Sequence, residues 1–163
     1  MIEIVAAIGR NNVIGNRGKL PWQGQIPADM QHFRELTTGH PVVMGRKTWE
    51  SLPERFRPLP GRRNYVLTRS GAIDGAEVAS LDTLAEMASS PYSCFVIGGA
   101  EIYHLAMPMA SALHLTLVHK EFAGDTYFPL YSVEDWKLEN LQTHPADDDN
   151  KYTCTFVTMR RKP

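Results

Sequence analysis

The sequence predicts an α/β protein: a single domain over residues 1–163, with a central, mostly parallel sheet, an antiparallel C-terminal edge and about four flanking helices. Three observations lead to this prediction. Apolar runs typical of buried strands alternate with helical patterns over the first two thirds of the chain, and such alternation favours a parallel sheet. The first run, "IEIVAAIG", is almost continuously apolar, as in a strand covered on both faces. The last third lacks helical patterns, so its strands are expected to form the antiparallel edge.

The first elements follow from local patterns. Residues 2–9 are expected to form a strand, and residues 10–25, rich in Gly and Asn, a long loop. A loop of that length in a compact domain usually has a function. A helix is expected from Pro27 to near Gly39, because proline suits the first helical position. "HPVVMG" predicts a short buried strand, and "RKTWESL" predicts a helix directly after it.

The later elements repeat this order. After the connection "PERFRPLPGRR", "NYVLT" and "EVA" predict strands, and "LDTLAEMAS" predicts an amphipathic helix. "CFVIGG" and "AEIYHLAM" form a second strand followed directly by a helix. "ALHLTLVH" predicts a strand and "FAGDTYFP" a turn region. "KYTCTFVTMRR" predicts the terminal strand, with "WKLENLQT" as its partner.

Composition excludes several classes of protein. The chain is 43% hydrophobic and 21% charged with a net charge of −1, as in an ordinary soluble domain. No run of Lys and Arg indicates a nucleic-acid or membrane partner, and no apolar run is long enough to span a membrane. The N-terminal segment lacks the basic region of a signal peptide. Two cysteines, Cys94 and Cys154, make no disulfide framework, so a cytoplasmic location is expected.

One acid, Asp29, lies on the apolar face of the first predicted helix. At about 100° per residue, this face also carries Ile26, Met30, Phe33, Leu36 and Thr37, whereas Gln31, Arg34 and Glu35 fall on the other. Two interpretations are open. An acid in the first turn favours the helix dipole, but an unpaired charge directed inward is costly unless it has a function.

Two strands run through glycine into a helix, in "VVMG-RKTW" and "FVIGG-AEIY". Such junctions present free backbone N–H groups to anions, although glycine also occurs there for steric reasons alone. Arg46, Lys47 and Thr48 follow the first junction, and Arg69 follows the strand "NYVLT". These residues predict a phosphate-binding edge, or else are solvated surface cations.

Several familiar signatures are absent. The chain has no G-x-G-x-x-G motif, no P-loop and no G-x-S-x-G elbow. His114 and His119 would face opposite sides of a strand, and "DDDNK" lacks the glycine and distal glutamate of an EF-hand. No metal is expected. One inward acid beside phosphate-binding features suits chemistry that a cofactor supplies.

The segments "PADMQHF", "VVMGRKTWESL", "LPGRRN", "VIGGAEIY" and "GDTYFP" resemble, in order and approximate spacing, the bacterial chromosomal dihydrofolate reductases. The resemblance covers residue 1 to about residue 160. It implies NADPH-dependent reduction of 7,8-dihydrofolate to tetrahydrofolate for one-carbon metabolism, by hydride transfer to C6 and protonation of N5. It also implies a cytoplasmic antifolate target that acts on a small-molecule substrate. A monomer is expected by default, because the sequence shows no long exposed apolar stripe.

The resemblance assigns catalytic and substrate-binding roles. Asp29 would hold the pterin N3–H and 2-amino group, with Trp22 and Leu20 completing the catalytic group. Apolar walls, a clamp for the glutamate α-carboxylate, backbone carbonyls and a hydroxyl behind the acid would complete the site. The substrate-binding residues so implied are Val5, Ala6, Asp29, Met30, Phe33, Leu52, Leu59, Arg62, Ile97, Tyr103 and Thr116. Arg62 is the implied clamp, and Thr116 the implied hydroxyl.

The resemblance also assigns contacts with NADPH. Ala7, Ile14 and Gly15 would contact the nicotinamide, and Gly45, Arg46, Lys47 and Thr48 the pyrophosphate, opposite Gly98 and Gly99. Thr68 and Arg69, with Arg46 as a further candidate, would lie at the adenosine 2′-phosphate, and Leu67 is another implied cofactor residue. The remaining implied cofactor residues are Ala100, Glu101, Ile102, Tyr103 and Thr126.

The sequence departs from the family pattern at three places. Four residues separate Trp22 from Pro27 where many members have two, "PERFR" adds length before "PLPGR", and Glu101 stands where some relatives have arginine. Two other functions remain open: an NADPH-dependent reductase acting on a pyrimidine intermediate of flavin synthesis, and a non-catalytic module that senses NADPH.

Overall fold

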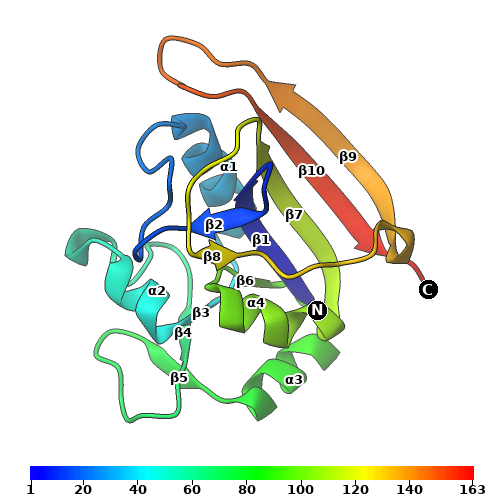
Figure 1. The fold of residues 1–163 in the computed structure, drawn as a ribbon. Coiled ribbons are helices and arrows are strands. Elements are labelled where there is room, and N and C mark those ends of the chain that lie inside the picture. Colours follow the sequence, from blue (N-terminus) through cyan, green and yellow to red (C-terminus); the bar gives the residue numbers. More distant parts are fainter.

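The computed structural model describes residues 1–163 and is built on one eight-stranded sheet (Figure 1). The strand order is β5-β4-β3-β6-β1-β7-β10-β9. All pairs from β5 to β7 are parallel, and β10 is antiparallel to both β7 and β9. The predicted sheet with its antiparallel edge is therefore confirmed. The strands are β1 (Ile2–Gly9), β3 (Val42–Gly45), β4 (Asn64–Leu67), β5 (Glu77–Ala79), β6 (Cys94–Val96), β7 (Ala110–Val118), β9 (Trp136–His144) and β10 (Cys154–Arg161).

Four α-helices cover the sheet, as predicted. They are α1 (Pro27–Thr37), α2 (Arg46–Ser51), α3 (Leu81–Ser89) and α4 (Ala100–Ala106), with 3-10 turns η1 (Glu54–Phe56), η2 (Met107–Met109) and η3 (Val133–Asp135). A capping box starts α3: the Ser80 side chain accepts a hydrogen bond from the Thr83 N–H, and the Thr83 hydroxyl accepts one from the Ser80 N–H. No helix is long and apolar enough to cross a membrane.

The alternating side chains of β1 supply two different core regions. Ile2, Ile4, Ala6 and Ile8 pack in one cluster with residues of α3 and α4. Val5 faces the opposite side and packs with β3, β4 and Trp49 of α2, next to residues of α1. The almost continuously apolar sequence of β1 reflects this burial on both faces, and Ala7 is its only residue that is not fully buried.

The long loop is the place where the structure differs from expectation. Residues 10–25 contain a short strand, β2 (Val13–Gly15), paired antiparallel with β8 (Thr126–Tyr127) inside the predicted turn region. The Gly15 carbonyl accepts a hydrogen bond from Asp125 N at 3.0 Å. A Cβ on Gly124 would lie 2.3 Å from Val13 Cγ1, so only glycine allows this approach. The pairing joins segments distant in sequence, and local patterns therefore could not predict it.

Candidate active site

The two glycine junctions lie side by side at the carboxyl edge of the parallel strands. Gly45, at the end of β3, donates its N–H to the Gly98 carbonyl at 2.8 Å. A Cβ on Gly45 would approach Ile102 Cγ1 to 3.0 Å. Gly98 has a φ of +117°, and a Cβ there would lie 3.1 Å from the Tyr103 hydroxyl. Side chains are thus excluded at both positions, and the two buried glycines let the strand-to-helix junctions before α2 and α4 meet through their backbones.

The first turns of α2 and α4 both lack a side-chain cap. Their N–H groups therefore keep hydrogen-bonding capacity toward an anion. An ideal Cβ on Gly99 would be 3.5 Å from the Thr48 hydroxyl, so this hydroxyl lies at the same junction. The residues of these first turns are Arg46, Lys47 and Thr48 in α2 and Ala100, Glu101 and Ile102 in α4.

A basic edge continues from α2 to the end of β4. Arg46 forms an exposed ion pair with Glu50 at 3.0 Å and donates to the Ser70 hydroxyl at 2.5 Å. The Thr68 hydroxyl lies 3.2 Å from that of Ser70, while exposed Arg69 has no hydrogen bond or ion pair. Sequence reasoning missed Ser70, whose only signal was its place directly after Arg69. Leu67 is half-buried at the end of β4 and packs against the main core.

Asp29 lies in the first turn of α1 and takes part in no ion pair. Burial raises the pKa of its carboxyl group, and the Thr116 hydroxyl on β7 offsets part of that effect. The start of α1 is held from outside the helix, because the Asn150 side chain accepts a hydrogen bond from Ala28 N at 2.9 Å. Asn150 had no signal in the sequence. The inward direction predicted for Asp29 agrees with this burial.

The groups beside Asp29 are aromatic and mostly buried. Trp22 is 2% exposed, packs edge-on against Phe122, and its indole Nε1–H has no hydrogen-bond partner in the protein. Tyr103 is buried on α4 and donates its hydroxyl to the Val5 carbonyl at 2.8 Å. Burial, and then the nearby Asp29 charge, raise the pKa of the Tyr103 hydroxyl. The acid, this tyrosine and the Val5 carbonyl therefore belong to one site.

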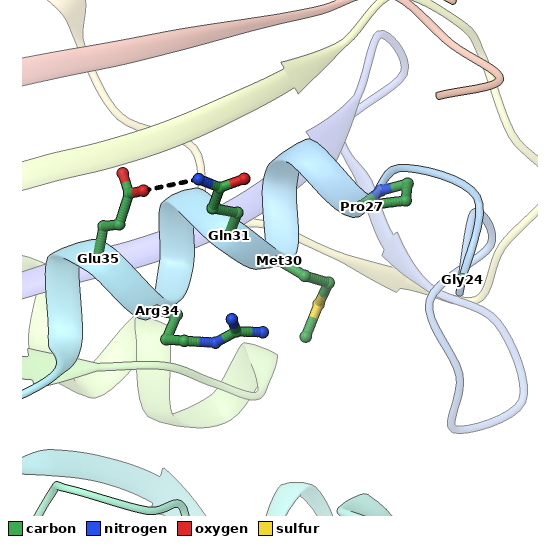
Figure 2. A pocket seen from close by; sticks show the side chains of 6 residues that line it. All are labelled: Gly24, Pro27, Met30, Gln31, Arg34 and Glu35. Carbon is green, nitrogen blue, oxygen red and sulfur yellow. Dashed lines mark hydrogen bonds between the residues drawn. The ribbon is translucent and has the colours of Figure 1, made fainter. Parts of the chain in front are cut away.

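The outer side of α1 differs in one respect from the predicted helical face. Met30 is 51% exposed and lines a surface hollow of about 500 Å³ together with Arg34, which was assigned to the opposite face. Figure 2 shows both side chains on one side of α1, while Gln31 donates to Glu35 at 2.9 Å. Met30 is the residue after Asp29 and is therefore rotated away from it around the helix, so Met30 lies at the exposed edge of the apolar face. The hollow is completed by Gly24, Pro27, Gln31 and Glu35.

Arg62 lies at the C-terminal end of α1. Its Nη1 donates to the Thr37 hydroxyl at 3.0 Å, its Nε donates to the Pro60 carbonyl at 2.9 Å, and its Cζ is 5.7 Å from the Phe33 ring centroid. No carboxylate pairs with it. Burial and the positive charge of Arg34 lower the pKa of this guanidinium. The arrangement leaves an oriented cation with capacity for an external carboxylate.

The other predicted site residues are spread over several parts of the fold. Phe33, Leu52, Leu59 and Ile97 pack in the cluster that contains Val5. Ala6 and Ile14 lie in the main core, whereas Ala7 packs beside Trp22. Gly15 pairs with Thr126 between β2 and β8, and Leu20 is 37% exposed in the following loop.

This fold and site define a class: α/β proteins that bind a ligand at the carboxyl edge of a parallel sheet, here around one enclosed acid. Comparison with known proteins narrows the class. The family model for dihydrofolate reductase matches residues 1–161, and the chain belongs to the dihydrofolate reductase family.

Individual relatives match over nearly the whole chain. Dihydrofolate reductase type 3 of Salmonella typhimurium is 44% identical, with 99% of both chains covered. Dihydrofolate reductase of Bacillus subtilis is 38% identical over 99% of this chain and 95% of the relative. The structure of dihydrofolate reductase from Enterococcus faecalis, complexed with NADP(H) and RAB-propyl, aligns with a TM-score of 0.88 at 30% identity, covering 100% of this chain and 97% of that one.

Proposed function

We propose that this protein reduces 7,8-dihydrofolate to tetrahydrofolate with NADPH, by hydride transfer to C6 and protonation of N5. The observation that carries the proposal is Asp29, an enclosed carboxyl group without a cationic partner. Membership of the dihydrofolate reductase family and the similarity to a relative solved with NADP(H) support it. A half-buried carboxylate without a cationic partner is costly to the fold, and a ligand that donates hydrogen bonds to it lowers that cost.

Asp29 suits the pterin ring because a carboxylate accepts two hydrogen bonds side by side. The pterin N3–H and 2-amino group form a matching pair of donors. Phe33 and Leu52 would flank the rings, and Met30 would cover them at the open border of α1. Arg62 would bind the glutamate α-carboxylate, since its guanidinium is oriented by two protein acceptors and lacks a protein anion.

The same acid assists proton transfer to N5. Its raised pKa keeps a proton available at higher pH than an ordinary aspartate would. The unpartnered indole N–H of Trp22 supports an ordered water as the link between the acid and N5. Thr116 and Tyr103 orient the acid and the neighbouring Val5 carbonyl without carrying the proton themselves.

The residues present fit a dinucleotide cofactor. The first turns of α2 and α4 lack side-chain caps and begin at the junctions where Gly45 bonds to Gly98, which suits a pyrophosphate bound by backbone N–H groups. Thr68 and Arg69, with Ser70 beside them, suit the adenosine 2′-phosphate. The chemistry that the cofactor supplies when bound is the hydride. The protein places the two rings together and excludes water around Asp29.

Mixing the protein with NADPH and dihydrofolate tests the proposal through the absorbance of the reduced nicotinamide. We expect a decrease that depends on both the protein and dihydrofolate. Binding of NADPH without oxidation would favour a sensor. Oxidation with a pyrimidine intermediate of flavin synthesis, but not with dihydrofolate, would favour the other reductase. Either result would overturn the proposed reaction.

A further inference from the structure

A second hollow, of about 510 Å³, lies at the end of α4 that is remote from the glycine junction. It is bounded by the last turn of α4, η2, the connection 129–135 and the end of β10. In Figure 1 the segment that leads into β9 lies beside the C-terminus. None of the residues proposed for dihydrofolate or NADPH lines this hollow, so the proposed function does not account for it.

Arg161 supplies a fixed cation in this hollow. Its Nε donates to the Ala110 carbonyl at 2.7 Å, and its Nη2 donates to the Met107 carbonyl at 2.6 Å. Its Cζ lies 4.3 Å from the Trp136 ring centroid, so the guanidinium is also stacked on an aromatic ring. No carboxylate pairs with Arg161, and its Nη1 has no hydrogen-bond partner in the protein. The cation is therefore oriented but not neutralised.

Asp135 supplies an anion in the same hollow. Its side chain has no hydrogen bond or ion pair, although its backbone is held by the Lys162 N–H, which donates to the Asp135 carbonyl at 2.9 Å. Arg161 pairs in register with Trp136, the residue after Asp135. A cation from the end of β10 and an anion from η3, the turn before β9, thus line one hollow without forming an ion pair with each other.

Apolar side chains form the rest of the surface. Trp136 is 5% exposed and Tyr131 is half-buried, whereas Leu130 is 91% exposed at the rim. Leu130 therefore offers accessible apolar surface at the rim of the hollow. The volume lies in the range of small-molecule sites in proteins.

We propose that this hollow binds a free amino acid with an apolar or aromatic side chain, in its zwitterionic form. The carboxylate would pair with Arg161, the ammonium group with Asp135, and the side chain would pack on Trp136, Tyr131 and Leu130. A carboxylate alone would meet the negative charge of Asp135, and an amine alone would meet the positive charge of Arg161. Only a ligand with both charges satisfies both groups.

Titration of the ¹⁵N-labelled protein with L-phenylalanine tests this proposal by NMR. The three tryptophans give three indole N–H signals, and a Trp136→Phe variant identifies the one from Trp136. We expect this signal to shift saturably at millimolar ligand, while the signals of Trp22 and Trp49 stay in place. 3-Phenylpropionate and phenethylamine, which each lack one charge, should bind about tenfold more weakly.

Two substitutions separate the roles of the charges. Asp135→Asn should abolish the preference for phenylalanine over 3-phenylpropionate, and it breaks no side-chain hydrogen bond or ion pair within the protein. Arg161→Lys should weaken binding of phenylalanine while the fold, checked by the rest of the spectrum, is kept. Lys137→Gln, on the same strand as Trp136, is the control and should bind as the wild type does.

Three outcomes would overturn the proposal. The first is the lack of a saturable shift of the Trp136 signal. The second is an equal shift of all three indole signals, which would indicate non-specific binding. The third is equal binding of phenylalanine and 3-phenylpropionate by the wild type. None of these outcomes bears on the reduction of dihydrofolate, which is measured separately.

Discussion

Replacement of Glu3 by glutamine removes a buried charge from the middle of the sheet. Glu3 is 4% exposed on β1, and its carboxylate accepts hydrogen bonds from Ser93 at 2.7 Å and from His114 Nε2 at 2.5 Å. Arg160 of β10 lies 3.4 Å away. Burial by itself raises the pKa of Glu3, but these hydrogen bonds and positive charges outweigh it and lower the pKa to about 2. The carboxylate is therefore more stable in the folded protein than in the unfolded chain.

The size of the effect follows from linkage between protonation and folding. A carboxyl pKa that falls from 4.5 to about 2 is worth about 3 kcal/mol of folding free energy. Because the folded pKa is depressed, this contribution is complete above about pH 4.5 and is lost as the pH falls toward 2. Glu3→Gln should therefore lower the free energy of unfolding at neutral pH by about 3 kcal/mol. The variant should also lose less stability in acid than the wild type does.

Urea unfolding of both proteins between neutral pH and pH 3 measures these quantities. Glu139→Gln is the matched control, because Glu139 pairs with the same Arg160 at 2.9 Å but its side chain is 50% exposed. An exposed pair contributes about 1 kcal/mol or less, so the control should stay close to the wild type. Equal losses for the two variants at neutral pH, or parallel pH profiles for Glu3→Gln and wild type, would refute the reasoning.

Four further predictions concern the site and the loop beside it. Asp29→Asn should lower turnover about 10²–10⁴-fold with NADPH affinity almost unchanged, and unchanged turnover would remove Asp29 from the mechanism. The variant should be at least as stable as the wild type at neutral pH, because the raised pKa of Asp29 means that its ionised form destabilises the fold. Wild-type turnover should fall as the pH rises through this raised pKa, and a pH-rate profile with the ordinary carboxyl value of 3.8 would contradict the prediction. Arg69→Ala should weaken NADPH about tenfold or more in a binding titration and leave NADH unaffected, whereas equal losses would argue against a 2′-phosphate contact. Gly124→Ala should lower the free energy of unfolding in urea by about 2 kcal/mol or more, because its Cβ overlaps Val13. The control Gly18→Ala, with open space around its Cβ, should lower it by about 1 kcal/mol because of its positive φ alone. Similar losses for the two variants would show that the overlap at Gly124 relaxes.

Much of the fold could be predicted because its signals are local. The apolar run of β1 predicts its burial on both faces, and α3 forms at the residues where the amphipathic pattern predicts a helix. The glycines before α2 and α4 indicated two backbone junctions, and helical periodicity indicated that Asp29 points inward. The same periodicity placed Met30 on the apolar face of α1, but Met30 lies at the edge of this face and is about half exposed.

Other features could not be predicted because they depend on partners distant in the chain. The β2–β8 pair, the tether of α1 by Asn150, and the place of Ser70 beside Arg46 all join segments that share no local pattern. Glu3 is the clearest case, since a single acid within an apolar run carries no sign of its partners. Its partners are supplied by β7, β10 and the segment before β6.

The sequence by itself determined the order of the four helices and of the strands of the main sheet, the two glycine junctions and the inward acid, because side-chain periodicity and backbone freedom are properties of neighbouring residues. Only the tertiary structure decided which charges meet. It pairs Glu3 with His114, leaves Asp29 without a cation, and leaves Arg161 and Asp135 facing one hollow. Electrostatic energy depends on distance in space and on burial, and both exist only once the chain has folded.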